Sequence, residues 1–311
     1  MNHTEFHHIS ILLDECLDAL QIRPDGTYMD ATLGGAGHSL RIAQRLGQGG
    51  RLICIDRDDE ALANARKRLA PVWDRVTLAK SDFRALDEVL AAEGLDGADG
   101  ILFDLGVSSP QLDEAERGFS YMHDAPLDMR MDRQQTLTAY DVVNTWSRED
   151  IRRILFEYGE ERYAPLIAAA IERRRAEQPV ETTRELAALI RGAMPAAALR
   201  EKQHPAKRSF QAIRIAVNDE LGAVREAMGK AIDVLKPGGA AGRHHLPLAG
   251  GPHCKGSIPV GGAGLHLSAR FPGVRVREKA ACKTHQPQTH PAGGGGSQGK
   301  CAGALGEAAR V

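Results

Sequence analysis

The chain has 311 residues, with 40 Lys and Arg against 41 Asp and Glu, a net charge of -1 and five cysteines. This length suits one large domain with an insertion, and the near-zero charge excludes a generally basic nucleic-acid-binding protein, so any such surface must be local. The cysteines lack metal-type spacing and no apolar run reaches signal-peptide or membrane-spanning length, which predicts a reduced cytoplasmic protein without a metal or a membrane partner.

A glycine-rich turn follows the first predicted strand. Residues 9–20 predict a helix that packs on a sheet or covers a cofactor, and residues 28–31 predict a short buried strand. Gly34, Gly35 and Gly37 then open a helix through Leu46, and the next strand, residues 51–55, ends in Asp56. An acid about 20 residues beyond such a turn is where nucleotide-binding folds hold ribose hydroxyls. The pattern favours a nucleoside cofactor over a purely structural turn.

The spacing of this turn bears on which cofactor it holds. Residues 34–38 read Gly-Gly-Ala-Gly-His and lack the G-x-G-x-x-G string of a dinucleotide site. Asp30 precedes the turn, which suits S-adenosylmethionine, a donor with an ammonium and a sulfonium but no phosphate. The spacing favours S-adenosylmethionine over NAD and leaves NAD as the alternative.

Two further strands end in candidate site residues. Residues 76–79 precede Phe83, which either stacks on the adenine or fills the edge of the core. Residues 100–103 end at Asp104, and ligands of open α/β sheets gather at the carboxyl ends of strands. Asp104 and Gln111 are therefore expected over the reacting end of the cofactor. Asp58 is expected to cap the helix of residues 58–69.

Helical patterns replace the strand–helix alternation over residues 112–206. Residues 146–214 carry 14 Lys and Arg against 10 Asp and Glu, and Arg173, Arg174 and Arg175 are consecutive. Such charges form either a solvated helix face or a platform for RNA. Residues 211–235 then predict one long helix that returns to the sheet before Lys-Pro-Gly-Gly at 236–239.

Several strings resemble the bacterial small-subunit rRNA cytosine-N4 methyltransferases over about residues 6–239. The matching strings lie at residues 6–8, 13–15, 37–39, 54–58, 104–113, 118–121, 126–132, 158–161 and 210–220. The resemblance implies S-adenosylmethionine as donor and a decoding-site cytidine of 16S rRNA as acceptor. It places donor contacts on Ala36, Gly37, His38, Asp56, Phe83, Asp104 and Gln111.

The acceptor side of the site rests on fewer residues. Asp104 is the first candidate to accept a hydrogen bond from the weakly nucleophilic cytosine amine, although donor binding is an alternative role. Asp124, Asp128 and Arg130 are weaker candidates for the acceptor pocket, and the helical segment would hold a flipped-out base and its phosphates.

The resemblance stops abruptly after Gly239. Residues 240–311 hold 15 Gly, no Asp and two Glu, with six of the twelve His and three of the five Cys, a composition that cannot bury a core. A metal-binding tail and a natural flexible tail are alternatives, but a reading-frame shift near residue 240 explains the composition best. Residues 242–245 offer no apolar run and are not expected to fill the place of a fifth strand beside the fourth. The tail is then expected to be degraded and the chain poorly active.

These patterns together predict a methyltransferase-type (Rossmann-like) open α/β sheet with an inserted all-helical domain and with its C-terminal strands missing or disordered. The expected parts are a donor-binding core at 1–111, a helical insert at 112–206, a returning core helix at 207–239 and an aberrant tail at 240–311. The leading function is cytosine-N4 methylation of 16S rRNA. The alternatives are an inactive product that keeps donor or RNA binding, and a methyltransferase acting on DNA or another RNA.

Overall fold

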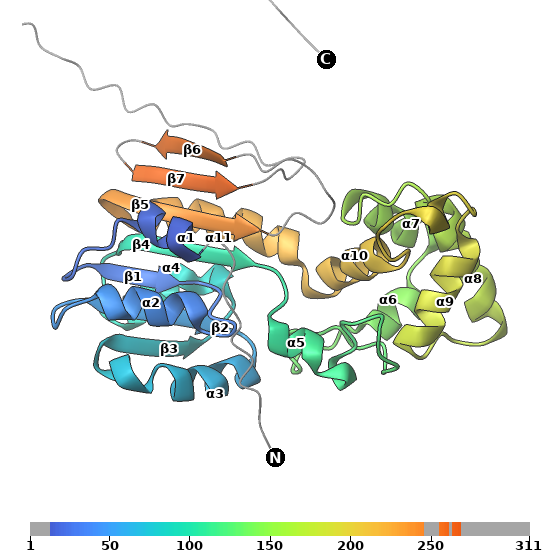
Figure 1. Cartoon of the computed structure of the whole chain (residues 1–311), viewed down its shortest axis with the longest axis horizontal. Helices are drawn as coiled ribbons and strands as arrows, with labels where there is room; N and C mark the ends of the chain where they lie inside the picture. The colour runs from blue at the N-terminus through green and yellow to red at the C-terminus, as the bar shows by residue number, and fades with distance from the viewer. Residues whose placement is uncertain (1–12, 246–254, 261–262, 269–311) are drawn as a thin grey trace, which may run out of the picture. The chain divides into compact units, whose positions relative to one another are not determined.

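A computed structural model describes residues 13–245, 255–260 and 263–268, and Figure 1 shows their arrangement. The described strands form one sheet in the order β3-β2-β1-β4-β5-β7-β6. Strands β1 to β5 pair in parallel, and β7 runs parallel to β5 and antiparallel to β6. Their bounds are β1 Thr27–Asp30, β2 Arg51–Asp56, β3 Val76–Lys80, β4 Ala98–Leu105, β5 Leu235–His245, β6 Lys255–Val260 and β7 Ala263–Ser268.

Helices cover both faces of this sheet because its strands are apolar on both sides. Successive side chains of a strand point to opposite faces, so Tyr28 and Met29 enter different cores. Tyr28 packs with side chains of α1, α2 and α3, whereas Met29 packs with those of α4 and α11. The bounds of these helices are α1 Leu13–Leu20, α2 Gly37–Arg45, α3 Asp59–Arg68, α4 Leu86–Ala92 and α11 Glu220–Val234.

The segment between β4 and α11 builds a third apolar core of its own. It gathers buried side chains from residues 119–217, including Leu155, Ile167 and Phe210, without a member from the sheet. The helices of this segment are α5 Ser109–Asp113, α6 Ala139–Thr145, α7 Arg148–Glu157, α8 Ala164–Glu177, α9 Thr183–Ala193 and α10 Lys207–Asn218. Short 3-10 turns lie at Ala70–Arg75, Phe83–Ala85, Ala115–Arg117 and Ala198–Arg200.

The open parallel sheet and the inserted helices confirm the predicted fold class. The described residues all belong to one compact unit that ends at Arg277, so the domain boundaries at 111, 206 and 239 stay predictions. Within the described ranges, no helix is both long and apolar enough to cross a bilayer.

The returning helix differs from the expectation of one continuous helix. Helix α10 ends at Asn218 and α11 begins at Glu220, with Asp219 between them at a left-handed φ of 45°. A continuous apolar pattern over 211–235 conceals this break, because both halves bury residues of the same kinds. The break turns the chain from the core of the inserted helices to that of the sheet.

The fifth strand also differs from the expectation that residues 242–245 could not occupy its place. In the structure β5 pairs with β4 as far as Leu105, with Ile101 opposite Ala241. Ala241 is 1% exposed and belongs to the same core as Met29. A parallel ladder is built from backbone groups, so a segment without an apolar run can still pair with β4. The predicted tail otherwise falls mostly outside the described residues.

Candidate functional site

The turn after β1 is built around a buried carboxylate. Asp30 accepts hydrogen bonds from the Thr32 N–H at 3.1 Å and the Ser39 hydroxyl at 2.5 Å. Burial raises the pKa of Asp30, against the opposing effect of these two hydrogen bonds. Gly34 and Ala36 both adopt left-handed backbone, with φ of 46° and 56°. The turn thus brings backbone N–H groups and the start of α2 to the carboxyl end of β1.

The acid at the end of β2 is fixed by that same turn. Asp56 accepts hydrogen bonds from the Gly34 N–H at 2.8 Å and the Asp58 N–H at 2.9 Å. Burial raises the pKa of Asp56 to about 6, although both hydrogen bonds lower it. A carboxylate offers about four lone-pair sites, so two of them remain for a pair of ribose hydroxyls. Asp56 therefore has the position and the acceptor capacity that a nucleoside site requires.

The acid at the end of β4 joins the turn from the other side. The Asp104 N–H donates to the Thr32 hydroxyl at 2.6 Å, and Asp104 Oδ2 lies 3.4 Å from His38 Nδ1. His38 is 5% exposed, whereas the Asp104 side chain is 36% exposed. Burial first, and then the charges of Asp104 and two other acids, raise the pKa of Cys16 on α1 to about 12. The structure therefore brings Asp30, Asp56 and Asp104 to one edge of the sheet, with His38 beside Asp104.

Two predicted donor contacts have protein partners of their own. Gln111 donates from Nε2 to Asp58 Oδ2 at 2.8 Å and accepts from the Ser108 N–H at 3.1 Å, so its amide braces the loop after β4. Phe83 is partly buried and meets Phe103 edge to face, with ring centroids 6.0 Å apart. This contact matches the core-edge alternative, while the exposed part of the Phe83 ring stays available to a ligand.

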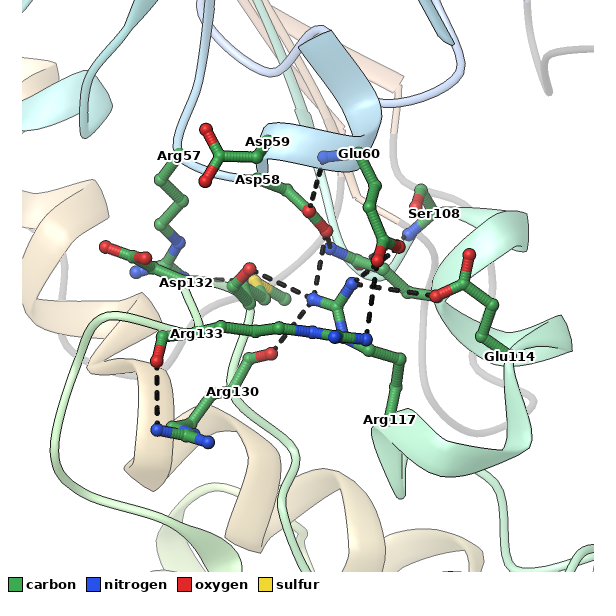
Figure 2. Close-up of polar contacts among 12 residues, drawn as sticks. Arg57, Asp58, Asp59, Glu60, Ser108, Glu114, Arg117, Arg130, Asp132 and Arg133 are labelled. Carbon is green, nitrogen blue, oxygen red and sulfur yellow. Dashed lines mark hydrogen bonds and ion pairs between the residues drawn. The ribbon is translucent and has the colours of Figure 1, made fainter. Parts of the chain in front are cut away.

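A buried arginine that the sequence analysis did not single out lies behind this edge, and Figure 2 shows its contacts. Arg117 is 2% exposed and contacts Asp58, Glu60 and the carbonyls of Arg130 and Met131. Asp58 caps α3 as predicted, accepting from the Glu60 N–H at 3.1 Å. A single arginine in a short turn carries no sequence pattern that indicates burial. The sequence feature that could have pointed to a buried cation is Asp58, an acid two residues after Asp56 that needs a partner.

The acceptor-pocket candidates fall into two groups. Arg130 forks onto Asp128 through two hydrogen bonds of 2.8 Å, and it also donates to the Gln135 carbonyl at 2.8 Å. Burial tends to raise the pKa of Asp128, but the bonds from Arg130 hold that pKa below its usual value. Asp124, in contrast, is exposed and lies 3.8 Å from Arg184. Asp128 and Arg130 shape a loop, whereas Asp124 belongs to the surface.

The three consecutive arginines of α8 have three different environments. Arg174 donates to the Gln178 carbonyl at 2.5 Å, and Arg175 donates to the Val143 carbonyl at 2.9 Å. Arg173 is exposed and, within the described part of the chain, has no hydrogen-bond or ion-pair partner. The run is therefore not a uniform patch.

A cleft of about 630 Å³ lies next to the end of β2. Its lining contains cations and acids in near balance together with the side chain of Asn218, and it does not include the predicted donor contacts. The lining residues are Arg57, Lys80, Ser81, Asp82, Arg84, Asp132, Gln134, Gln135, Val217, Asn218 and Asp219. The cleft joins the ends of β2 and β3 to the loop that follows Arg130.

Comparisons with known proteins place this chain among methylases. The model of the MraW methylase family matches residues 5–242. "Ribosomal RNA small subunit methyltransferase H" of Brevibacillus brevis is 59% identical over 239 residues, 77% of this chain and 76% of that protein. The protein of the same name from a Paenibacillus species is 60% identical over 75% of this chain and 76% of its own length. An rRNA methylase structure from Streptococcus thermophilus is 20% identical with a TM-score of 0.27, covering 32% of this chain and 53% of that one.

Proposed function

Because the chain belongs to the MraW methylase family, we propose that it transfers a methyl group from S-adenosylmethionine to the N4 amine of a decoding-site cytidine in 16S rRNA. The coarser part, methylation of small-subunit rRNA with S-adenosylmethionine as donor, follows from the family and from relatives of 59% and 60% identity. The observation that carries the proposal is the meeting of three acids, Asp30, Asp56 and Asp104, around the glycine turn within the matched residues.

The donor site fits this assignment through its acceptors. Asp56 keeps two acceptor sites for ribose hydroxyls after binding the N–H groups of Gly34 and Asp58. Gly34 has no side chain and adopts left-handed backbone, which allows close approach of a nucleoside, and α2 begins at Gly37. When bound, the donor supplies an electrophilic methyl group on its sulfonium.

Asp104 is the residue we assign to the acceptor amine. Its carboxylate lies at the carboxyl end of β4, partly exposed, while its own N–H is fixed to Thr32. An oxygen of this carboxylate can accept an N–H of the cytosine amine and hold the nitrogen lone pair in line with the methyl group. Positioning of this kind offsets the low nucleophilicity of an amine conjugated with its ring. After transfer, an Asp104 oxygen is also placed to accept the proton that the amine releases.

A second candidate is a protein that binds donor or RNA without transferring the methyl group. One observation favours it: the family match ends at residue 242, and the composition changes sharply at the same place. Strand β5 ends at His245, beside the segment of β4 that carries Asp104. A change of sequence within β5 therefore alters the strand that pairs with β4, which carries the proposed catalytic residue Asp104. The reading-frame hypothesis stays a prediction.

Two measurements separate these functions. Calorimetric titration with S-adenosylhomocysteine reports on the donor site, and labelled S-adenosylmethionine reports transfer to small ribosomal subunits that lack the modification. The proposed function predicts donor binding and label in the small-subunit rRNA, with no label in subunits that already carry it, whereas the reading-frame hypothesis predicts donor binding with little or no transfer. Binding without transfer, together with transfer by a version whose reading frame is corrected near residue 240, would support the second candidate. Label in DNA but not in rRNA would reject both.

A further inference from the structure

A charged side chain is rarely buried without a specific role, and Arg117 is the most buried arginine around the candidate site. Its side chain is 2% exposed, and a guanidinium offers five N–H donors in a rigid fork. Nη2 lies 3.0 Å from Asp58 Oδ2, and Nη1 lies 3.1 Å from Glu60 Oε2. Replacing buried ion pairs by apolar side chains is often neutral for stability, so stability alone does not account for this one.

One set of contacts of Nη2 leads to the donor site. The carboxylate that Arg117 holds belongs to Asp58, whose backbone N–H donates to Asp56 Oδ1 at 2.9 Å. The same carboxylate accepts from Gln111 at 2.8 Å and caps α3. Asp58 therefore links Arg117 to Asp56, the residue proposed to bind the ribose hydroxyls. A shift of Asp58 moves an N–H donor of the Asp56 carboxylate and so changes the orientation of that carboxylate.

The same nitrogen also contacts the loop that carries Asp128 and Arg130. Nη2 of Arg117 also donates to the carbonyls of Arg130 at 3.1 Å and Met131 at 3.0 Å, and the Arg117 carbonyl accepts from the Met129 N–H at 3.0 Å. Met129 has a left-handed φ of 59°, a conformation that bulky residues adopt only when their surroundings impose it.

The far side of this loop is held by α10. Asn218 accepts from the Met131 N–H at 2.8 Å and donates to the Met129 carbonyl at 2.7 Å. Asp132, the next residue along the loop, lines the 630 Å³ cleft together with Asn218. The loop is therefore clamped between the donor side, through Arg117, and the inserted helices, through Asn218.

We propose that Arg117 is a positioning residue that couples occupancy of the donor site to the loop of residues 128–132 and so to binding of the RNA acceptor. This inference rests on the proposed function. A donor that engages Asp56 fixes Asp58, Asp58 fixes the guanidinium, and the guanidinium fixes two loop carbonyls. Such coupling is reciprocal, so bound RNA must tighten donor binding by the same factor.

Arg117→Lys tests the coupling, because lysine keeps the charge but loses the planar fork that reaches Asp58 and both carbonyls together. Arg133→Lys is the matched control: it comes from the same loop and contacts Glu60 at 3.3 Å, but is 57% exposed. The readout is the calorimetric Kd of S-adenosylhomocysteine with and without a small-subunit rRNA fragment that contains the decoding site. Donor-dependent hydrogen exchange of the residue 129–131 amides is measured in parallel.

We expect RNA to tighten donor binding about fivefold or more in the wild type and in Arg133→Lys, and less than twofold in Arg117→Lys. Protection of the loop amides by donor should follow the same order. Asp58→Asn keeps the cap of α3 but removes the charge opposite Arg117, so it should also lose the coupling. It is the alternative test if Arg117→Lys does not fold. If the wild type binds RNA without any change in donor affinity, or if all folded variants show equal coupling, this inference is overturned while the proposed function stands. A wild type that binds donor but no RNA would instead contradict the proposed function.

Discussion

Two charged groups of the molecule differ in their hydrogen-bond partners: the acids at the ends of β1 and β2, and the arginines at the end of α8. Asp30 accepts from the Thr32 N–H, and Asp56 accepts from the N–H groups of Gly34 and Asp58, so backbone groups fix both carboxylates. Arg174 and Arg175 donate to the carbonyls of Gln178 and Val143. Asp56 keeps acceptor sites for a ligand, whereas the guanidinium groups of Arg174 and Arg175 already donate to carbonyls of the protein. A carboxylate with acceptor sites left over is therefore the firmer functional assignment.

The largest expected effect is at Asp56. Asp56→Ala removes the acceptor of two ribose hydroxyls, and charge-assisted hydrogen bonds contribute about 1.5–3 kcal/mol, so donor affinity should fall roughly 10- to 150-fold. Asp59→Ala is the control, because Asp59 is exposed, lies on the first turn of α3 and pairs with Lys80. Calorimetry with S-adenosylhomocysteine checks both variants. An unchanged dissociation constant for Asp56→Ala would remove Asp56 from the donor site.

The pH dependence of donor binding sharpens the same assignment. The ribose hydroxyls need an ionised acceptor, and the pKa of Asp56 is raised to about 6 in the folded protein. Affinity should be full above pH 7 and fall as pH drops through that pKa, because only the ionised fraction binds, and it should be about tenfold weaker at pH 5. Titrations between pH 5 and 8 measure this, with Asp56→Asn expected to bind weakly and without the pH dependence. A wild-type profile that rises toward pH 5 would contradict the assignment.

The sign of the stability effect at Asp56 is opposite to that of binding. The folded-state pKa of Asp56 lies above its unfolded value, so the folded state retains a proton that the unfolded state loses between about pH 4 and 6. Asp56 therefore lowers the free energy of unfolding as pH rises through that window. Donor binding above pH 6 offsets this loss, so S-adenosylhomocysteine should raise the melting temperature more at pH 7 than at pH 5. An equal shift at both pH values would contradict the proposed role.

The smallest effects are expected in the arginine run, where single substitutions distinguish its members. Arg173→Ala should reduce the slope of log K for RNA binding against log salt concentration by about 0.7–0.9, the effect of one phosphate contact. It should not lower thermal stability. Arg175→Ala should instead cost about 1 kcal/mol of stability, since it loses a hydrogen bond to Val143, and leave the salt slope unchanged. Each variant thus controls for the other.

The triple change of Arg173, Arg174 and Arg175 to Ala should flatten the salt slope about as much as Arg173→Ala alone, while donor affinity stays unchanged. A slope change three times as large would show that all three arginines contact RNA. Equal RNA affinity and slope in wild type and triple variant would return the whole run to a solvated helix face.

Sequence patterns predict local geometry at this site better than they predict long-range partners. Glycines between a strand and a helix indicate the turn itself, because its left-handed backbone is a local requirement, although the bond from the Gly34 N–H to Asp56 spans 22 residues. The partner of Gln111 and the burial of Arg117 depend on contacts 53 and 59 residues away, to which periodicity carries no signal. The pairing of residues 242–245 was mispredicted for a different reason, since the lack of an apolar run guided the expectation while backbone pairing formed the strand.

The chemical identity of the product tests the proposed function most directly. Small ribosomal subunits lacking the modification are incubated with the chain and labelled S-adenosylmethionine, and the rRNA is then digested to nucleosides for mass spectrometry. We predict that the label appears as N4-methylcytidine from the decoding site and that, at limiting donor concentration, it falls in Asp56→Ala along with donor affinity. A labelled nucleoside methylated at any other atom or base would contradict the proposed attack by the cytosine amine at Asp104.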